Sequence, residues 1–303
     1  MNELYAADPA VCGHASELKL LLASFGPYTG RYLANYPIGW SALVENQLEG
    51  PGEVEIARVK LLLQRARESI SLITKANLPW GIEKDWLTNA QPLLAKTPLA
   101  PAVFDGLIAT QAKPPAIHHL HELDLPPTAE ERIAGTAHEY ARATKILLLL
   151  SPELAMIDPY LNPLNRYCFA VLKAMFDIAA KGKCEKITLW ARASIVIGHS
   201  TYAAIKNDLE ETVNQLARQA NFKPGRAIEV LLVEDESRQT KMHGRYLLSI
   251  KGGIRLDQGF QQLPEGRHVD VGPIGKTTHN VLLDIYFDGK HDMRVAERLV
   301  LKL

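Results

Sequence analysis

The chain has 303 residues, which is too long for one small core and sufficient for two domains. Lys and Arg together number 34, as do Asp and Glu, and the resulting net charge of zero argues against non-specific DNA binding through a broad basic surface, while leaving room for a local basic cleft. The three cysteines form no Cys-x-x-Cys pair, and their odd number argues against a disulfide framework or a structural zinc site.

The sequence carries no pattern of membrane targeting. Its first residues, MNELYAADPA, lack the basic and apolar regions of a secretory signal peptide. The apolar run Ile146–Leu150 is far too short to cross a bilayer. We therefore expect a cytoplasmic protein with no membrane span.

Residues 1–115 are predicted to form an all-α domain. The clearest helix is predicted over Glu53–Ala76, where apolar residues recur every three or four positions. This stripe consists of Ile56, Val59, Leu63, Ala66, Ile70 and Ile73. It favours packing inside the domain over a coiled coil with a partner, because a coiled coil usually needs more heptads. A scaffold role, in which this helix engages another protein, is kept as an alternative.

Residues 116–127 are predicted to be a linker, because Pro-Pro pairs bracket this part of the chain and disfavour helix. The linker contains three histidines close together, His118, His119 and His121. No cysteine or carboxylate completes a recognised metal-binding spacing, so a solvated or interfacial strand is favoured over a metal site.

Residues 128–303 are predicted to form an α/β domain. Thr128–Glu131 reads as a capping box that starts a helix running to Leu150. Strands and helices then alternate, which indicates a mixed sheet flanked by helices. The predicted strands are Leu154–Ile157, Lys186–Ala191, Ala227–Glu234 and Asn280–Phe287, and the predicted helices are Tyr167–Ala180 and Tyr202–Ala220. Because ligands of such sheets bind beyond the carboxyl ends of the strands, Asp158, Arg192 and the residues after Glu234 are expected near one rim.

The segment Lys241–Phe260 concentrates the most chemistry. It is predicted to form two strands around a turn at Gly252-Gly253. His243 and Arg245 are two positions apart, so on a strand they share a face. A histidine beside a fixed cation is suited to hold a phosphate group and to attack it or protonate its leaving group. The alternative interpretation is structural, with His243 bonded within the sheet and the arginines in ion pairs.

Three segments together resemble the phospholipase-D-like superfamily over about residues 130–303: IDPYL from Ile157, MHGRYLLS from Met242, and GGIRLDQGF from Gly252. The resemblance is closest to the divergent branch whose motif reads His-x-Arg-Tyr-hydrophobic, as in the C-terminal domain of MIT-domain proteins. Active superfamily members carry His-x-Lys, four residues, Asp, then a glycine turn and Asn. Here Arg245 stands in place of the lysine and Ile250 in place of the aspartate.

The resemblance implies a phosphodiester-binding protein that uses no metal and no cofactor. His243 would be the nucleophile, and Arg245 would hold the phosphate. The expected substrate-binding residues are Asp158, Tyr160, Arg192, Gly252, Gly253, Arg255, Asp257 and Gln258. The superfamily mechanism needs a second histidine, which would come from a second copy of the chain in a homodimer, or from His279 or His291.

Two functions follow from these observations as hypotheses. The first is a metal-independent nuclease, which the resemblance associates with bacterial multi-protein systems such as antiphage defence. The second is a catalytically inactive module that binds nucleic acid, another phosphodiester or a protein partner, because the aspartate is replaced and only one histidine motif is present.

Overall fold

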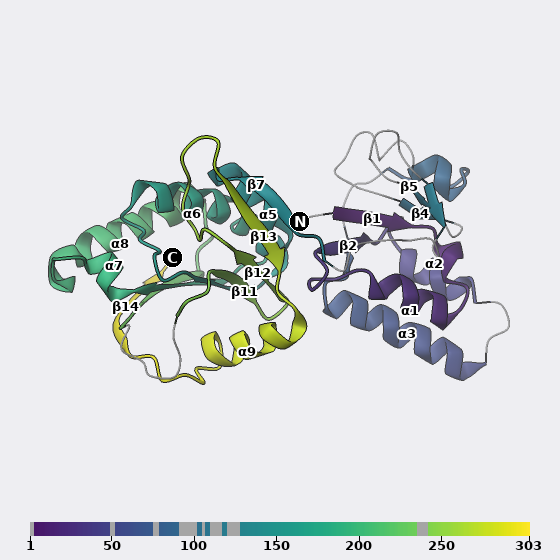
Figure 1. Cartoon of the computed structure of the whole chain (residues 1–303). Helices are drawn as coiled ribbons and strands as arrows, with labels where there is room; N and C mark the ends of the chain where they lie inside the picture. The colour runs from purple at the N-terminus through teal and green to yellow at the C-terminus, as the bar shows by residue number, and fades with distance from the viewer. Residues whose placement is uncertain are drawn as a thin grey trace. The chain divides into compact units, whose positions relative to one another are not determined.

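The computed structural model describes residues 3–48, 52–74, 79–90, 102–104, 107–109, 117–119, 128–234 and 242–303. The chain divides into two compact units, one of residues 2–129 and one of residues 130–303, and each is described by itself (Figure 1). The predicted α/β class is confirmed. None of the described helices combines the length and the apolar composition that crossing a bilayer requires.

The first unit contains a sheet with strand order β3-β2-β1-β4-β5-β6, so the prediction of an all-α domain is wrong. Strands β1, β2, β3 and β4 are mutually parallel, and β5 and β6 continue the sheet in antiparallel fashion. All of them are short, with five residues or fewer, and they show no clear alternation that a sequence reader would detect. Their bounds are Glu3–Ala7 (β1), Arg31–Ala34 (β2), Leu72–Ile73 (β3), Ala102–Phe104 (β4), Leu107–Ala109 (β5) and Ile117–His119 (β6). Strand β6 falls within the predicted linker, whereas His121 lies outside the described residues.

The helices of this unit include α1 (Ala15–Ala23), α2 (Trp40–Asn46) and α3 (Glu53–Glu68), a short 3-10 helix over Pro9–Cys12, and a helical segment at residues 86–90. Helices α1, α2 and α3 pack on the strands through a shared apolar core (Figure 1).

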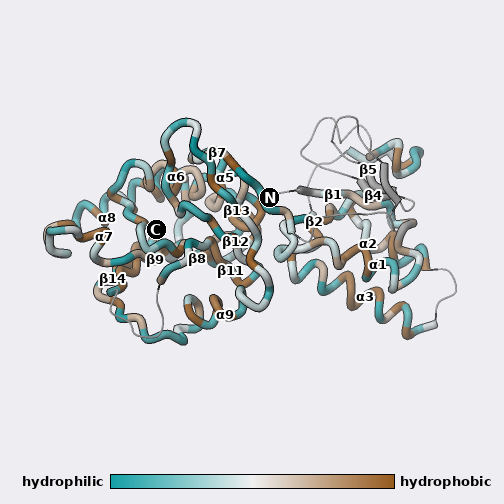
Figure 2. The backbone as a smooth tube through the Cα atoms, viewed as in Figure 1, coloured by the Kyte–Doolittle hydropathy of each residue, from teal (hydrophilic) through white to brown (hydrophobic). Residues whose placement is uncertain are grey.

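Helix α3 contributes the core residues that its sequence stripe predicts. Val59, Leu63 and Ala66 are buried against the strands and α1, so the packing interpretation is confirmed over a coiled coil. In Figure 2 the helix alternates between apolar and polar colours, as expected for one buried face. The helix ends at Glu68 rather than Ala76, because Ile70 adopts a left-handed φ of 54° and the chain enters β3.

The second unit is built on an eight-stranded mixed sheet with order β14-β10-β9-β8-β11-β12-β13-β7. Its strands are β7 (Glu131–Ala134), β8 (Glu153–Ile157), β9 (Lys186–Arg192), β10 (Ala227–Val233), β11 (Tyr246–Ser249), β12 (Gly252–Leu256), β13 (His268–Pro273) and β14 (Val295–Lys302). Strands β8, β9 and β10 are parallel, and the other neighbours are antiparallel.

Helices cover both faces of this sheet, as Figure 1 shows, with α5 and α6 on one face and α9 on the other. The helices are α5 (Ala137–Leu150), α6 (Arg166–Ala179), α7 (Ala193–Ile197), α8 (Tyr202–Gln219) and α9 (Lys276–Tyr286). The predictions for β8, β9, β10, α6 and α8 are confirmed to within one or two residues.

Two of the predicted boundaries and element types in this unit, those of α5 and α9, are wrong. The expected helix start at Thr128–Glu131 is instead the entry to β7, and the true cap of α5 is Thr136, whose hydroxyl accepts from the Glu139 amide at 3.4 Å. The apolar run Asn280–Phe287 forms most of α9 rather than a strand. On that helix His279, Leu282 and Tyr286 are buried at spacings of three and four, so the same residues also satisfy a helical period.

Candidate functional site

The predicted rim exists at the end of the sheet where β8, β9 and β10 terminate. Strand β11 runs antiparallel to β8, so β11 starts at the end of the sheet where β8 terminates. Strand β12 runs parallel to β8 and terminates at that same end. The side chains gathered there are Asp158 and Tyr160 after β8, Arg192 at the end of β9, and Arg245 before β11. We call these four residues the rim site.

Asp158 is the buried anchor of the rim site, with 3% of its surface exposed. Its Oδ1 accepts a hydrogen bond from the Tyr160 amide at 2.8 Å, and its Oδ2 accepts one from the Phe260 amide at 3.0 Å. The Arg245 Nε lies 3.6 Å from Oδ1. Burial raises the pKa of Asp158, and the two amide donors and Arg245 offset part of this rise. Asp158 therefore holds Tyr160, Phe260 and Arg245 in place, and both of its carboxylate oxygens already accept hydrogen bonds.

Arg245 is held between Asp158 and the loop that follows β12. Its Nη1 donates to the carbonyl oxygen of Asp257 at 2.8 Å, and about a third of the side chain (32%) remains exposed. The loop passes so close that only glycine fits at position 259. There φ is +72°, and a Cβ would lie 1.9 Å from the Asp158 Oδ2.

Tyr160 lies between two arginines. Its ring centroid is 5.6 Å from the guanidinium carbon of Arg192 and 5.3 Å from that of Arg245, within the range of cation–π interaction. Arg192 is itself held by a bond from its Nη2 to the carbonyl of Met242 at 3.2 Å. Nearly half of the tyrosine side chain (49%) is exposed, so an aromatic surface flanked by two cations faces solvent.

His243 is exposed and lies in the connection that precedes β11, which begins only at Tyr246. The shared strand face predicted for His243 and Arg245 is therefore not formed by a strand. Among the described residues, the structure records no hydrogen bond or ion pair to the His243 ring, which also removes the interpretation that it bonds within the sheet.

The two intrachain candidates for a second histidine are placed differently. His279 is buried under the far end of β11, where its Nε2 lies 2.8 Å from the Ser249 carbonyl oxygen, and burial lowers its pKa. His291 packs edge-on against Trp190, with ring centroids 5.7 Å apart. It precedes β14, whose first residue pairs with Val233 at the end of β10, so His291 lies at the rim and His279 does not.

The glycine pair of the motif is not in the rim site. The hairpin turn is formed by Ile250 and Lys251, and Gly252 and Gly253 begin β12 as buried residues at the opposite end from Arg245. A Cβ on Gly253 would lie 2.7 Å from the Leu248 Cδ2 and 2.8 Å from the Ile274 Cδ1, so this glycine serves packing.

The remaining predicted residues, Arg255, Asp257 and Gln258, are not among the four residues of the rim site. Asp257 contributes its carbonyl oxygen to Arg245, while its side chain and that of Gln258 are exposed. Arg255 is exposed on β12 and lines a different, small cavity of about 230 Å³ with Glu130 and Asp270 among others. Sequence reasoning missed Gly259 and Phe260, because their contact with Asp158 joins residues about a hundred positions apart.

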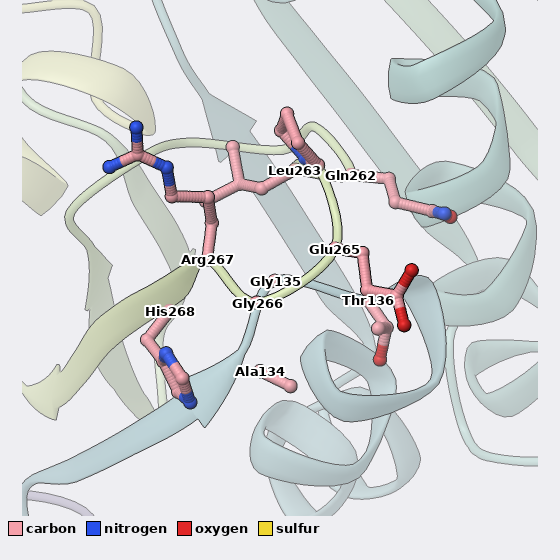
Figure 3. Close-up of a pocket in the computed structure, with 10 residues that line it drawn as sticks. Ala134, Gly135, Thr136, Gln262, Leu263, Glu265, Gly266, Arg267 and His268 are labelled. Carbon is pink, nitrogen blue, oxygen red and sulfur yellow. The ribbon is translucent and has the colours of Figure 1, made fainter.

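A larger cavity of about 350 Å³ lies beside the same edge of the sheet (Figure 3). It is formed where the loop after β12 meets the turn between β7 and α5, and it includes Thr136, Glu265 and His268. The amide of Leu263 donates to the Gly135 carbonyl at 2.8 Å and closes this junction. No residue of the rim site lines the cavity.

Metal ligands do not cluster in the described part of the chain: no group of three or more His, Cys, Asp or Glu side chains is positioned there to hold an ion. The side chains of His118, His119 and His121 fall outside that part. The three cysteines are free and buried, and burial raises the pKa of each thiol.

In comparisons with known proteins, no family model and no curated protein matches the chain. Among solved structures, one match is TrmBL2, an archaeal chromatin protein whose structure shows a novel mode of DNA binding. The identity is 10%, the alignment covers 83% of this chain and 87% of that one, and the TM-score is 0.29. A likeness of this degree carries no argument about the fold or the function of this chain.

Proposed function

We propose that the second unit binds a phosphodiester of nucleic acid at the rim site. The observation that carries this proposal is the pair Arg192 and Arg245, fixed on either side of the exposed Tyr160 at the carboxyl end of the sheet. Guanidinium groups match the geometry of phosphate oxygens, and this edge of an α/β sheet is where ligands commonly bind.

Pre-organisation of the arginines supports the proposal. Arg245 is oriented by the Asp158 carboxylate and the Asp257 carbonyl, and Arg192 by the Met242 carbonyl. A side chain that is already held in place loses less conformational entropy when it binds a ligand. The zero net charge of the chain agrees with a local site rather than a broad basic surface.

Recognition is favoured over cleavage. A catalytic histidine needs a neighbour that orients its ring and sets its proton, and no such neighbour of His243 occurs among the described residues. The position of the expected aspartate, Ile250, is in the turn at the other end of the hairpin. A metal-independent nuclease is the second candidate, because His243 is exposed two residues from Arg245 and open to a ligand at the rim. A role in antiphage defence is implied by the sequence resemblance alone.

The proposal is tested by fluorescence anisotropy of labelled oligonucleotides in EDTA, at low and at high salt. Arg192→Ala should weaken binding about tenfold, as expected for the loss of one charge-assisted contact. Arg218→Ala removes an exposed arginine in the last turn of α8, at the opposite end of the strands from the rim site, and should leave the affinity unchanged. Absence of binding by the wild type, or equal effects of the two variants, would overturn the proposal.

Cleavage is followed on gels in the same samples. Turnover in EDTA by the wild type that is lost in His243→Ala would establish the second candidate. Intact oligonucleotides bound by both proteins are the result that recognition predicts.

A further inference from the structure

The first turn of α6 carries a second exposed tyrosine that sequence reasoning did not single out. Tyr167 is 45% exposed, close to the value for Tyr160. It too has an arginine on its ring: the Arg166 guanidinium carbon lies 4.6 Å from the ring centroid, and its Nη2 donates to the tyrosine hydroxyl at 2.6 Å. The exposed Leu164 lies between Tyr160 and Tyr167 in the sequence.

Hydrogen bonds join the segments that carry the two tyrosines to one short part of the loop after β12, Phe260–Gln262. The Phe260 amide donates to Asp158, two residues before Tyr160, and the Gln262 amide donates to the carbonyl of Tyr167 at 3.1 Å. Two residues of extended chain span at most about 7 Å, so these anchor points are close together. The segment between β8 and α6 is fixed further by local hydrogen bonds, since the side chains of Asn162 and of the helix cap Asn165 each accept from a backbone amide two residues on.

We propose that the rim takes single-stranded nucleic acid, with phosphates at the arginines and bases stacked on Tyr160 and Tyr167. This inference rests on the proposed function and specifies the class of ligand. Aromatic rings that alternate with cations along a groove or edge are suited to a single strand, because every base offers a flat face to stack on. In a duplex those faces are already stacked on their neighbours, so the tyrosines would add nothing.

The test compares three ligands of equal length and charge per strand: a single-stranded oligonucleotide, the same strand with abasic sites, and its duplex. Anisotropy is measured in EDTA for the wild type, Tyr160→Leu, Tyr167→Leu and the double variant. Each single variant should weaken binding of the normal strand about fivefold or more, and the double variant should combine the two losses. Binding of the abasic strand should change less than about twofold in the same variants.

The matched controls are Tyr160→Phe and Tyr167→Phe, which keep the ring and remove only the hydroxyl. They should retain most of the affinity, and thermal unfolding of all variants checks that the fold is intact. If the wild type binds abasic and normal strands equally, or binds the duplex as well as the single strand, stacking is overturned while phosphate binding stands. If it binds none of the ligands, the proposed function fails as well.

Discussion

The two ends of the β11–β12 hairpin have opposite characters, although one contiguous sequence motif spans both. At the rim end, Arg245 faces Asp158 and the Asp257 carbonyl and is partly open to solvent. At the turn end, Gly253 and His279 are buried among apolar side chains. A motif of glycines, histidines and charges thus separates into a polar surface site and a packed core. Residue type alone does not distinguish the two, whereas strand direction and burial do.

The largest expected effect is at the rim end, from Asp158→Ala. The variant leaves two backbone amides without an acceptor and Arg245 without its carboxylate, which should lower the free energy of unfolding by about 4 kcal/mol. Urea denaturation measures this. The matched control is Asp270→Ala, which breaks an exposed ion pair with Arg132 at 3.8 Å and should cost less than about 1 kcal/mol. If the two variants lower the free energy of unfolding by similar amounts, Asp158 does not hold the rim site together.

Gly259→Ala should have the next largest effect, about 3 kcal/mol, because the added Cβ collides with the Asp158 carboxylate in a left-handed backbone. Gly266→Ala is the control for conformation alone: its φ is +78°, and no atom lies within 4 Å of the added Cβ. It should cost about 1 kcal/mol. The difference between the two measures the contact, and a vanishing difference would contradict the close approach of loop and carboxylate.

The turn end should make the stability of the protein depend on pH. Burial lowers the pKa of His279, so the unfolded chain takes up a proton more readily than the folded one. Stability should therefore be unaffected well above pH 6.5 and should fall as the pH drops below it, by at most about 1.4 kcal/mol per pH unit.

The test compares urea unfolding at pH 7.5 and 5.5 in the wild type, His279→Gln and His243→Gln. The first variant should lose this part of the pH dependence, and the second should keep it, because His243 is exposed. Loss of the dependence in His243→Gln would reverse the assignment of the two histidines.

The smallest effect is expected from Asp257→Asn. Its side chain is an exposed negative charge at the rim, and its contact with Arg245 is made by the backbone, which the variant keeps. Removal of the charge should strengthen oligonucleotide binding about twofold at low salt, with the gain fading at high salt. Asp208→Asn on α8 is the control, and a salt-independent gain would point to a cause other than electrostatics.

The central strands and two long helices of the second unit were predictable from sequence, because β8, β9 and β10 are short, mainly apolar segments and α6 and α8 repeat apolar residues at helical spacing. Helix α9 was not, since the mainly apolar stretch Asn280–Phe287 is only eight residues long and fits either period. The start of α5 was misplaced because the pattern Thr-x-x-Glu occurs twice, at Thr128 and at Thr136, and local sequence does not say which one precedes a helix. The strands of the first unit are too short to leave a pattern.

The site was predictable in part. The rule that ligands bind at the carboxyl ends of strands led to Asp158 and Arg192, and the structure brings both to one edge with Tyr160 and Arg245. The glycines were misplaced because a Gly-Gly pair suits a strand under tight packing as well as a turn. The loop around Gly259 depends on a hydrogen bond between distant segments, which no local pattern encodes.

The most direct test is an amide chemical-shift titration of the labelled protein with a short single-stranded oligonucleotide in EDTA. Phosphodiester binding at the rim predicts shifts at Tyr160, Arg192, Arg245 and Gly259, with Gly252 and Gly253 at the turn end unmoved. Shifts centred on the turn end or on the first unit, or no shifts at all, would contradict the account.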